Sequence, residues 1–303
     1  MEHDEPTASK WADMQKDILI KIFLLLDVLE LPSIAQVCSE WRIAVLDHML
    51  WRTLNLSMLK SNFIKIPIEP YVYVDSHSDN TLMRVLRVAM NLSMGSTVTL
   101  IFHFNLYITD DQLTYTAERC PKLKRLVMPS WNRVKKSGIC KAIRMWPDLE
   151  SMTLLSMADL PYLLEEISRN CKNFSELKVI GPCDTLYASA LTKFLPGLKV
   201  LSLRCSRISK EALNTILEGL PNLEVLNISH SLIIDVPQLP ASPRVLKDLD
   251  QSILKKAGRL RRFFTCTDDN CTMCQRTRAD DGLLRWYRYE ELWKMDEVKS
   301  LAL

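Results

Sequence analysis

The chain has 303 residues, of which 48% are hydrophobic and 25% are charged, the composition of a folded protein and not of a disordered one. The formal net charge of +3 comes from scattered Lys and Arg residues, which argues against nucleic acid as a partner. Nine cysteines, mostly isolated, and an acidic amino terminus unlike a secretory signal indicate an intracellular protein, nuclear or cytoplasmic, with reduced thiols.

The first predicted elements are three short helices between residues 11 and 51, at roughly 15 to 29, 31 to 38 and 39 to 48. The stretch ILIKIFLLLDVLEL, residues 18 to 31, contains eleven apolar residues, which surround a helix instead of forming one stripe. It is too short and too charged to cross a membrane. A unit of forty residues cannot bury all these side chains, and leaving five in water would forfeit about 8 to 15 kcal/mol. We therefore expect a partner to cover one side.

A phrase with the spacing LxxLxL then repeats along the chain. Five clear copies, at intervals of 26, 25, 24 and 25 residues, begin at Leu123, Leu149, Phe174, Leu198 and Leu223. Weaker copies at Trp51, Thr97 and Leu260 raise the expected number of strands to about eight. This interval is typical of a solenoid in which each strand is followed by a helix, so the predicted class is α/β, with the apolar positions in a shared core.

The segments between the phrases are predicted to be helical. In SKEALNTILEGL, Ser209 can cap the helix while Ala212, Ile216 and Leu217 fall on one side. Three prolines after residue 236 predict an inserted loop before a helix over 244 to 257.

The positions between the core residues of each phrase point out of the row of strands, where another protein can bind. Their mixture of charged and small polar side chains suits protein recognition, although it also suits a solvated face. The candidate substrate-binding residues are Lys124, Arg125, Thr153, Lys178, Ser202, Arg204, Asn227 and Arg261.

Sequence motifs for catalysis are missing. The seven glycines are at least sixteen residues apart, which excludes GxGxxG, the P-loop and GxSxG. The five histidines form neither HExxH nor a close pair with a cysteine. We predict no catalytic residue and no cofactor.

The carboxyl end carries CTDDNCTMC, with Cys266, Cys271 and Cys274 in a spacing used for metals or redox chemistry. A structural zinc site needs four ligands, and no further Cys or His follows, so we predict ordinary thiols that close the last repeat and no metal. Trp286, Tyr289 and Trp293 then recur at helical spacing. They predict a helix that covers the open end of the solenoid, a substrate-contacting aromatic patch being the alternative.

The helical segment resembles the F-box, the module that docks on the Skp-family adaptor of cullin-based ubiquitin ligases. The matching residues are Asp17, Ile18, Leu19, Ile22, Phe23, Leu26, Leu29, Leu31, Val37, Cys38, Trp41, Arg42 and Trp51. Met14 and Gln15 stand where the family usually has Leu-Pro. The resemblance implies adaptor contacts at Met14, Ile18, Ile22, Leu31, Pro32, Val37 and Trp41.

An F-box followed at once by leucine-rich repeats of the cysteine-containing kind is similar to the plant-type F-box/LRR-repeat proteins. The expected parts are a tail over 1–10, the F-box over 11–51, the repeats over 52–265 and a cap or tail over 266–303. The resemblance implies a non-catalytic substrate receptor of an SCF-type (cullin-RING) ligase, which reaches cullin through the adaptor and binds a protein substrate on its repeats. A scaffold that delivers no substrate and a receptor for a small signalling molecule are the alternatives.

Overall fold

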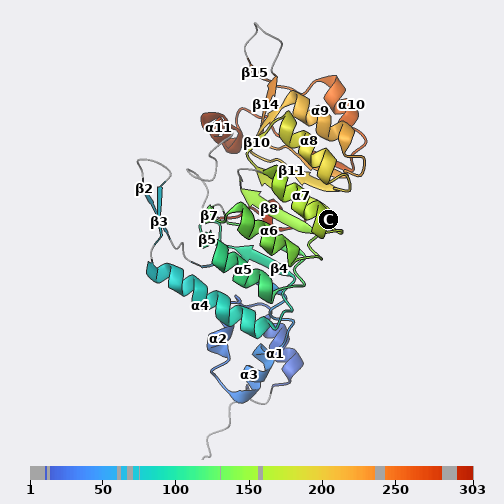
Figure 1. The fold of residues 1–303 in the computed structure, drawn as a ribbon. Coiled ribbons are helices and arrows are strands. Elements are labelled where there is room, and N and C mark those ends of the chain that lie inside the picture. Colours follow the sequence, from blue (N-terminus) through green and yellow to red (C-terminus); the bar gives the residue numbers. More distant parts are fainter. Residues whose placement is uncertain are drawn as a thin grey trace, which may run out of the picture.

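A computed structural model shows a helical bundle at one end, from which the coils of a solenoid stack away (Figure 1). The residues that it describes are 11, 14–59, 63–66, 71–74, 76–129, 131–155, 160–235, 243–281 and 292–302.

The bundle contains the three predicted helices, α1 (Lys16–Phe23), α2 (Leu31–Ile34) and α3 (Ser39–Val45). Helix α1 ends well before residue 29, the predicted end, because side chains beyond it bind the backbone locally. The Asp27 carboxylate accepts a hydrogen bond from the amide of Leu29 at 2.9 Å, and the Glu30 carboxylate accepts one from the amide of Asp27 at 3.0 Å. Such bonds stabilise a turn in place of the next helical turn.

Eight parallel strands form the main sheet, in the order β1-β4-β6-β8-β9-β11-β13-β16. Each covers the end of one predicted phrase, so the predicted eight strands are confirmed. Their bounds are β1 Thr53–Leu56, β4 Thr99–Phe102, β6 Arg125–Val127, β8 Ser151–Leu155, β9 Glu176–Ile180, β11 Val200–Ser202, β13 Val225–Asn227 and β16 Arg262–Phe264. Equal intervals keep the phrases in register: Leu126 is paired with Leu100 on one side and Met152 on the other.

Helices pack beside one another along the solenoid, and polar side chains fix where several of them begin. The bounds are α4 Ser76–Ser93, α5 Asp110–Arg119, α6 Lys136–Arg144, α7 Leu160–Asn170, α8 Thr185–Phe194, α9 Lys210–Gly219 and α10 Gln251–Ala257. The predicted helix cap at Ser209 is confirmed, since the Ser209 hydroxyl accepts a hydrogen bond from the amide of Ala212 at 3.1 Å. The predicted helix over 244 to 257 is wrong in its first half, because residues 244 and 245 pair antiparallel with β14 (Leu232–Asp235) as β15 (Arg244–Val245).

Shorter strands form three further sheets. The first contains β10 (Pro182–Cys183) and β12 (Arg207–Ser209) beside β14 and β15. The others are the pair β5 (Tyr107–Thr109) and β7 (Trp131–Arg133), and the hairpin of β2 (Phe63–Ile66) and β3 (Tyr71–Val74). Beyond the last repeat strand lie α11 (Thr272–Ala279) and α13 (Met295–Val298).

One hydrophobic core extends from Leu19 in the bundle to Ala257 in the last repeat helix. Trp51 joins the two parts: its side chain is buried, and its indole N–H donates to the carbonyl of Val45 at 2.7 Å. The bundle is therefore a continuation of the solenoid core. Among the described residues, no helix is long and apolar enough to span a membrane.

Candidate functional site

Helix α1 divides its apolar side chains between the core and solvent. Leu19 and Phe23 are buried, whereas Ile18 is 45% exposed and Leu25, in the turn after the helix, is 86% exposed. Val37, between α2 and α3, is 62% exposed. Residues 18 and 22 fall on one side of α1 by their spacing. The described part of the solenoid therefore leaves an apolar surface on the bundle uncovered, as the composition of the segment predicted.

The predicted adaptor contacts differ in their exposure. Ile18 and Val37 are exposed, and Met14, Ile22, Pro32 and Trp41 are half-buried. The prediction for Leu31 is wrong, because this side chain is 2% exposed and belongs to the core.

Sequence reasoning missed several exposed apolar residues of the bundle, which are Leu24, Leu25, Leu26, Ile43, Leu46 and Met49. Leu24, Leu26 and Met49 line a cavity of about 370 Å³ between the end of α1 and β1. Their only sequence signal is the density of apolar residues, which does not say which ones face solvent.

An ion pair joins the start of α1 to the end of α3. The ammonium of Lys16 lies 3.0 Å from the carboxylate of Asp47, and its hydrogen bond is the main reason why the pKa of Asp47 is below its ordinary value. Lys16 is half-exposed, so the pair contributes little to stability and chiefly orients the two helices.

The other predicted surface, the outer face of the main sheet, is largely covered by the chain itself. Residues 292–302, here called the terminal segment, lie across its middle strands. Thr153 on β8 donates to the carbonyl of Glu297 at 2.8 Å, and Lys178 on β9 donates to the carbonyl of Asp296 at 2.7 Å. Arg204, after β11, pairs with the carboxylate of Asp296 at 3.0 Å.

Because the terminal segment lies on the sheet, the prediction of an open substrate-binding face is corrected. The candidates that are buried are Thr153, Lys178, Ser202 and Asn227. Arg125 and Arg204 are mostly buried and paired with carboxylates. Lys124 and Arg261 remain exposed, the first paired with Glu150 and the second donating to the carbonyl of Ala302.

A charged network lies beneath the terminal segment. The Glu176 carboxylate is 3.2 Å from both Lys178 and Arg125 and accepts a hydrogen bond from Ser300 at 2.8 Å. Burial opposes ionisation of Glu176, but the two cations outweigh it and hold its pKa below the ordinary value. Burial also lowers the pKa of Lys178, against the attraction of Glu176. With three acceptors around its ammonium, Lys178 is satisfied as a buried cation.

Trp293 anchors the start of the terminal segment. Its indole N–H donates to the carbonyl of Phe102 at 2.7 Å, and its ring meets that of Phe104 edge-on, with centroids 4.9 Å apart. These residues lie at the end of β4, far from the open end of the solenoid at β16. Trp286 and Tyr289, the other members of the predicted cap helix, lie outside the described residues.

The sequence comparisons agree with this architecture. Residues 16–57 match the F-box-like family. An F-box/LRR-repeat protein of Arabidopsis thaliana is 55% identical over 306 residues, which cover 100% of this chain and 99% of that protein. The chain belongs to the F-box/LRR-repeat proteins. A putative F-box protein of A. thaliana is 28% identical over 330 residues, covering 97% of this chain and 96% of the relative.

A third relative in A. thaliana, F-box protein SKIP1, is 26% identical over 248 residues, covering 74% of this chain and 80% of that protein. For the F-box/LRR-repeat protein described here, the matched family region is the bundle together with β1, and it contains the uncovered apolar surface.

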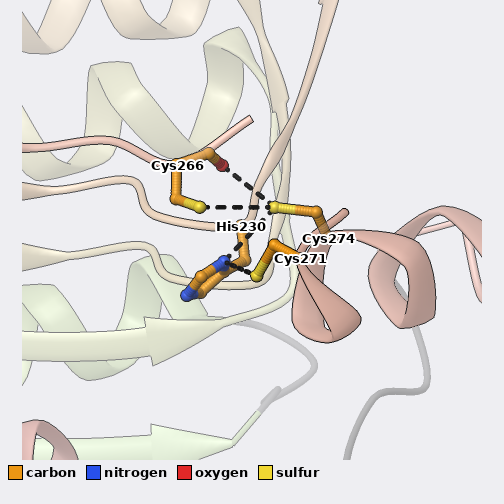
Figure 2. Close-up of side chains that lie close together, drawn as sticks. All are labelled: His230, Cys266, Cys271 and Cys274. Carbon is orange, nitrogen blue, oxygen red and sulfur yellow. Dashed lines mark hydrogen bonds between the residues drawn. The ribbon is translucent and has the colours of Figure 1, made fainter. Parts of the chain in front are cut away.

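A second candidate site lies where β13 and β16 end. Cys266, Cys271 and Cys274 are joined there by His230, and their ligand atoms all lie within 4.8 Å of one another (Figure 2). Sequence reasoning considered only residues after the cysteines and missed His230. The repeat contains the signal: His230 follows Leu223 by seven residues, and Cys266 follows Leu260 by six, so adjacent coils place them side by side.

Proposed function

We propose that this protein is a substrate-receptor subunit of an SCF-type (cullin-RING) ubiquitin ligase. The observation that carries the proposal is the exposure of the apolar side chains of Ile18, Leu25 and Val37 on the F-box bundle. The occupant proposed for this surface is the Skp-family adaptor, and through it cullin.

Burial of this surface supplies a useful part of the affinity. Complete burial of one such side chain contributes about 1.5 to 3 kcal/mol, so covering what Ile18, Leu25 and Val37 now expose contributes about 3 to 6 kcal/mol. A micromolar complex needs about 8 kcal/mol of net binding free energy. The half-buried Met14, Ile22, Pro32 and Trp41 of the same bundle are proposed to supply additional contact area.

The proposed mechanism is approximation. The bundle is held by the adaptor while the repeat domain holds a protein substrate, which raises the effective concentration of a substrate lysine near the charged conjugating enzyme. The continuous core between bundle and solenoid suits this role, because it fixes the distance between the two binding surfaces.

The test of adaptor docking uses side chains that are already exposed, so that a charge leaves the fold intact. The Ile18→Asp, Val37→Asp double variant is expected to recover at least about tenfold less adaptor in a pull-down. Leu186→Asp, at an exposed leucine of α8, is the matched control and is expected to recover the wild-type amount. Equal recovery by the double variant, with an unchanged circular dichroism spectrum, would remove the proposal.

For the substrate we propose a site on the outer side of the terminal segment. Reaching Thr153 or Lys178 would require breaking buried hydrogen bonds that contribute about 0.5 to 1.5 kcal/mol each, and about 1.5 to 3 kcal/mol where a charge is involved. Leu292 and Met295, by contrast, are exposed apolar residues of the segment itself. Lys124 and Arg261 are exposed although each has a partner within the chain, and we propose that they contribute to the contact with the substrate.

The corresponding test compares ubiquitin-modified peptides in cells that express either the wild-type chain or a Leu292→Ser, Met295→Ser variant. Peptides enriched by the wild type are expected to fall to the level of cells without the chain, while adaptor recovery stays unchanged. An unchanged peptide set would refute this site. Adaptor binding without any chain-dependent ubiquitination or change in protein lifetime would instead favour a scaffold.

A further inference from the structure

Four side chains from three parts of the chain converge on one point beside α11. Figure 2 shows the thiols of Cys266, Cys271 and Cys274 and the imidazole of His230 turned toward one another. His230 belongs to the coil of β13, Cys266 follows β16, and Cys271 and Cys274 lie at the amino end of α11.

Three of the six distances between these atoms match a tetrahedral zinc site, and all six are within 4.8 Å. With Zn–S of about 2.3 Å and Zn–N of about 2.0 to 2.1 Å, tetrahedral ligands are about 3.8 Å apart for two sulfurs and about 3.6 Å apart for sulfur and nitrogen. The Sγ atoms of Cys266 and Cys274 are 3.7 Å apart. His230 Nδ1 lies 3.3 Å from Cys274 Sγ and 3.5 Å from Cys271 Sγ.

The solenoid itself places His230 and Cys266 together. The amide of Cys205 donates to the carbonyl of Ser229 at 3.0 Å, and the amide of His230 donates to the carbonyl of Cys266 at 3.0 Å. This ladder continues the parallel sheet beyond the ends of β11, β13 and β16. His230 is thus held by the repeat before any ligand binds, and only the segment that carries the other two cysteines has to fold onto it.

A disulfide is a poor alternative for this cluster. The sulfurs of Cys266 and Cys274 are separated by far more than the bond length of about 2.05 Å, and all nine cysteines, each within the described residues, are free thiols. The remaining alternative is four side chains that merely form hydrogen bonds. A bound cation would hold all three cysteines as thiolates, which a set of hydrogen bonds alone does not require.

Helix α11 has few attachments to the solenoid through its own side chains, one being the ion pair between Asp281, just after the helix, and Arg207 on β12. Its buried residues are Cys274 and Thr277, so no large apolar side chain of α11 enters the core. Side chains within the segment bind each other, as when Gln275 donates to the carbonyl of Asp269 at 2.8 Å. A metal bridge between His230 and the three cysteines would connect this segment to the solenoid.

We propose that His230, Cys266, Cys271 and Cys274 bind one structural zinc ion. Four protein ligands complete the tetrahedron and leave no open position for a substrate or a water molecule, which distinguishes a structural site from a catalytic one. The ion holds α11 at the point where the chain leaves the last repeat. This proposal is independent of adaptor docking.

The deciding experiment is X-ray absorption spectroscopy on the full-length wild-type chain, purified without chelators. The expected zinc shell contains three sulfurs at about 2.3 Å and one nitrogen at about 2.0 to 2.1 Å. Elemental analysis is expected to give about one zinc per chain. A chain without zinc, a shell with a different composition, or a disulfide within the cluster would overturn the proposal.

Variants give an independent test. His230→Ala is expected to retain less than about 0.2 zinc per chain, whereas His230→Cys preserves a complete ligand set and is expected to retain about one. Cys38→Ser, at an isolated cysteine of the bundle, is the matched control and is expected to retain the wild-type amount. Zinc content that is unchanged in His230→Ala would overturn the assignment.

Discussion

The covered sheet face makes a quantitative prediction for Glu176, which lies between the sheet and the terminal segment. Glu176→Gln keeps the volume of the side chain and removes its charge. The ammonium of Lys178, whose side chain is 3% exposed, then loses its buried carboxylate and keeps only backbone carbonyls as partners. Arg125 and Ser300 lose the same charged acceptor.

Removing one partner of a buried ion pair costs about 3 to 5 kcal/mol, and we expect about 3 kcal/mol because glutamine can still accept one hydrogen bond. The matched control is Glu150→Gln. Glu150 pairs with Lys124 at 2.5 Å, but these side chains are 42% and 46% exposed, so we expect a loss below about 1 kcal/mol.

The assay is thermal unfolding of the full-length chain, followed by circular dichroism. A loss of about 3 kcal/mol corresponds to a decrease in Tm of about 5 °C for a chain of this size. Proteolysis at the terminal segment, read by mass spectrometry, is expected to be faster in Glu176→Gln than in Glu150→Gln. Equal Tm values and equal proteolysis rates for the two variants would refute the proposed network.

Three further predictions follow from particular contacts. The pKa of Glu176 in the folded protein is below its ordinary value of 4.5, so ionised Glu176 stabilises the fold above that pH and this stabilisation is lost as the pH falls through the folded pKa. The difference in Tm between wild type and Glu176→Gln should therefore narrow on acidification from pH about 6 to 3. Gly138→Ala should lower the free energy of unfolding in urea by about 1 to 3 kcal/mol, because the added Cβ would lie 2.0 Å from Asp110 Oδ1. Gly197→Ala is the control and should not destabilise the fold, because Gly197 has open space around it. Trp293→Ala should lower the free energy of unfolding by about 1 to 3 kcal/mol and increase amide hydrogen exchange in residues 294–302. Unchanged exchange would contradict the anchoring role of Trp293.

Local patterns predicted the repeat architecture well. The phrase from Leu123 and its copies identify eight strands because each coil buries the same positions against its neighbours. The cap at Ser209 was predictable for a similar reason, since it involves an amide only three residues away. Features that depend only on the adjacent coil or on residues a few positions away can be recognised from local patterns in the sequence.

Exposure within the bundle was less predictable. Leu31 and Leu25 have the same side chain and lie in the same apolar run, yet the first is buried and the second is almost fully exposed. The early end of α1 decides between them, because it changes the direction of every following side chain. A hydrophobic pattern indicates that a partner is needed but does not select the residues that meet it.

The sequence by itself determined the solenoid, its strand positions and the excess of apolar surface in the first forty residues. Only the tertiary structure placed the terminal segment on the sheet and His230 beside three cysteines. The physical reason is separation along the chain: Thr153 and Glu297 are 144 positions apart, and His230 and Cys274 are 44 apart. A lysine such as Lys178 is expected at the surface, and it is buried here because a segment distant in the sequence covers it. Contacts of this kind depend on the path of the whole chain.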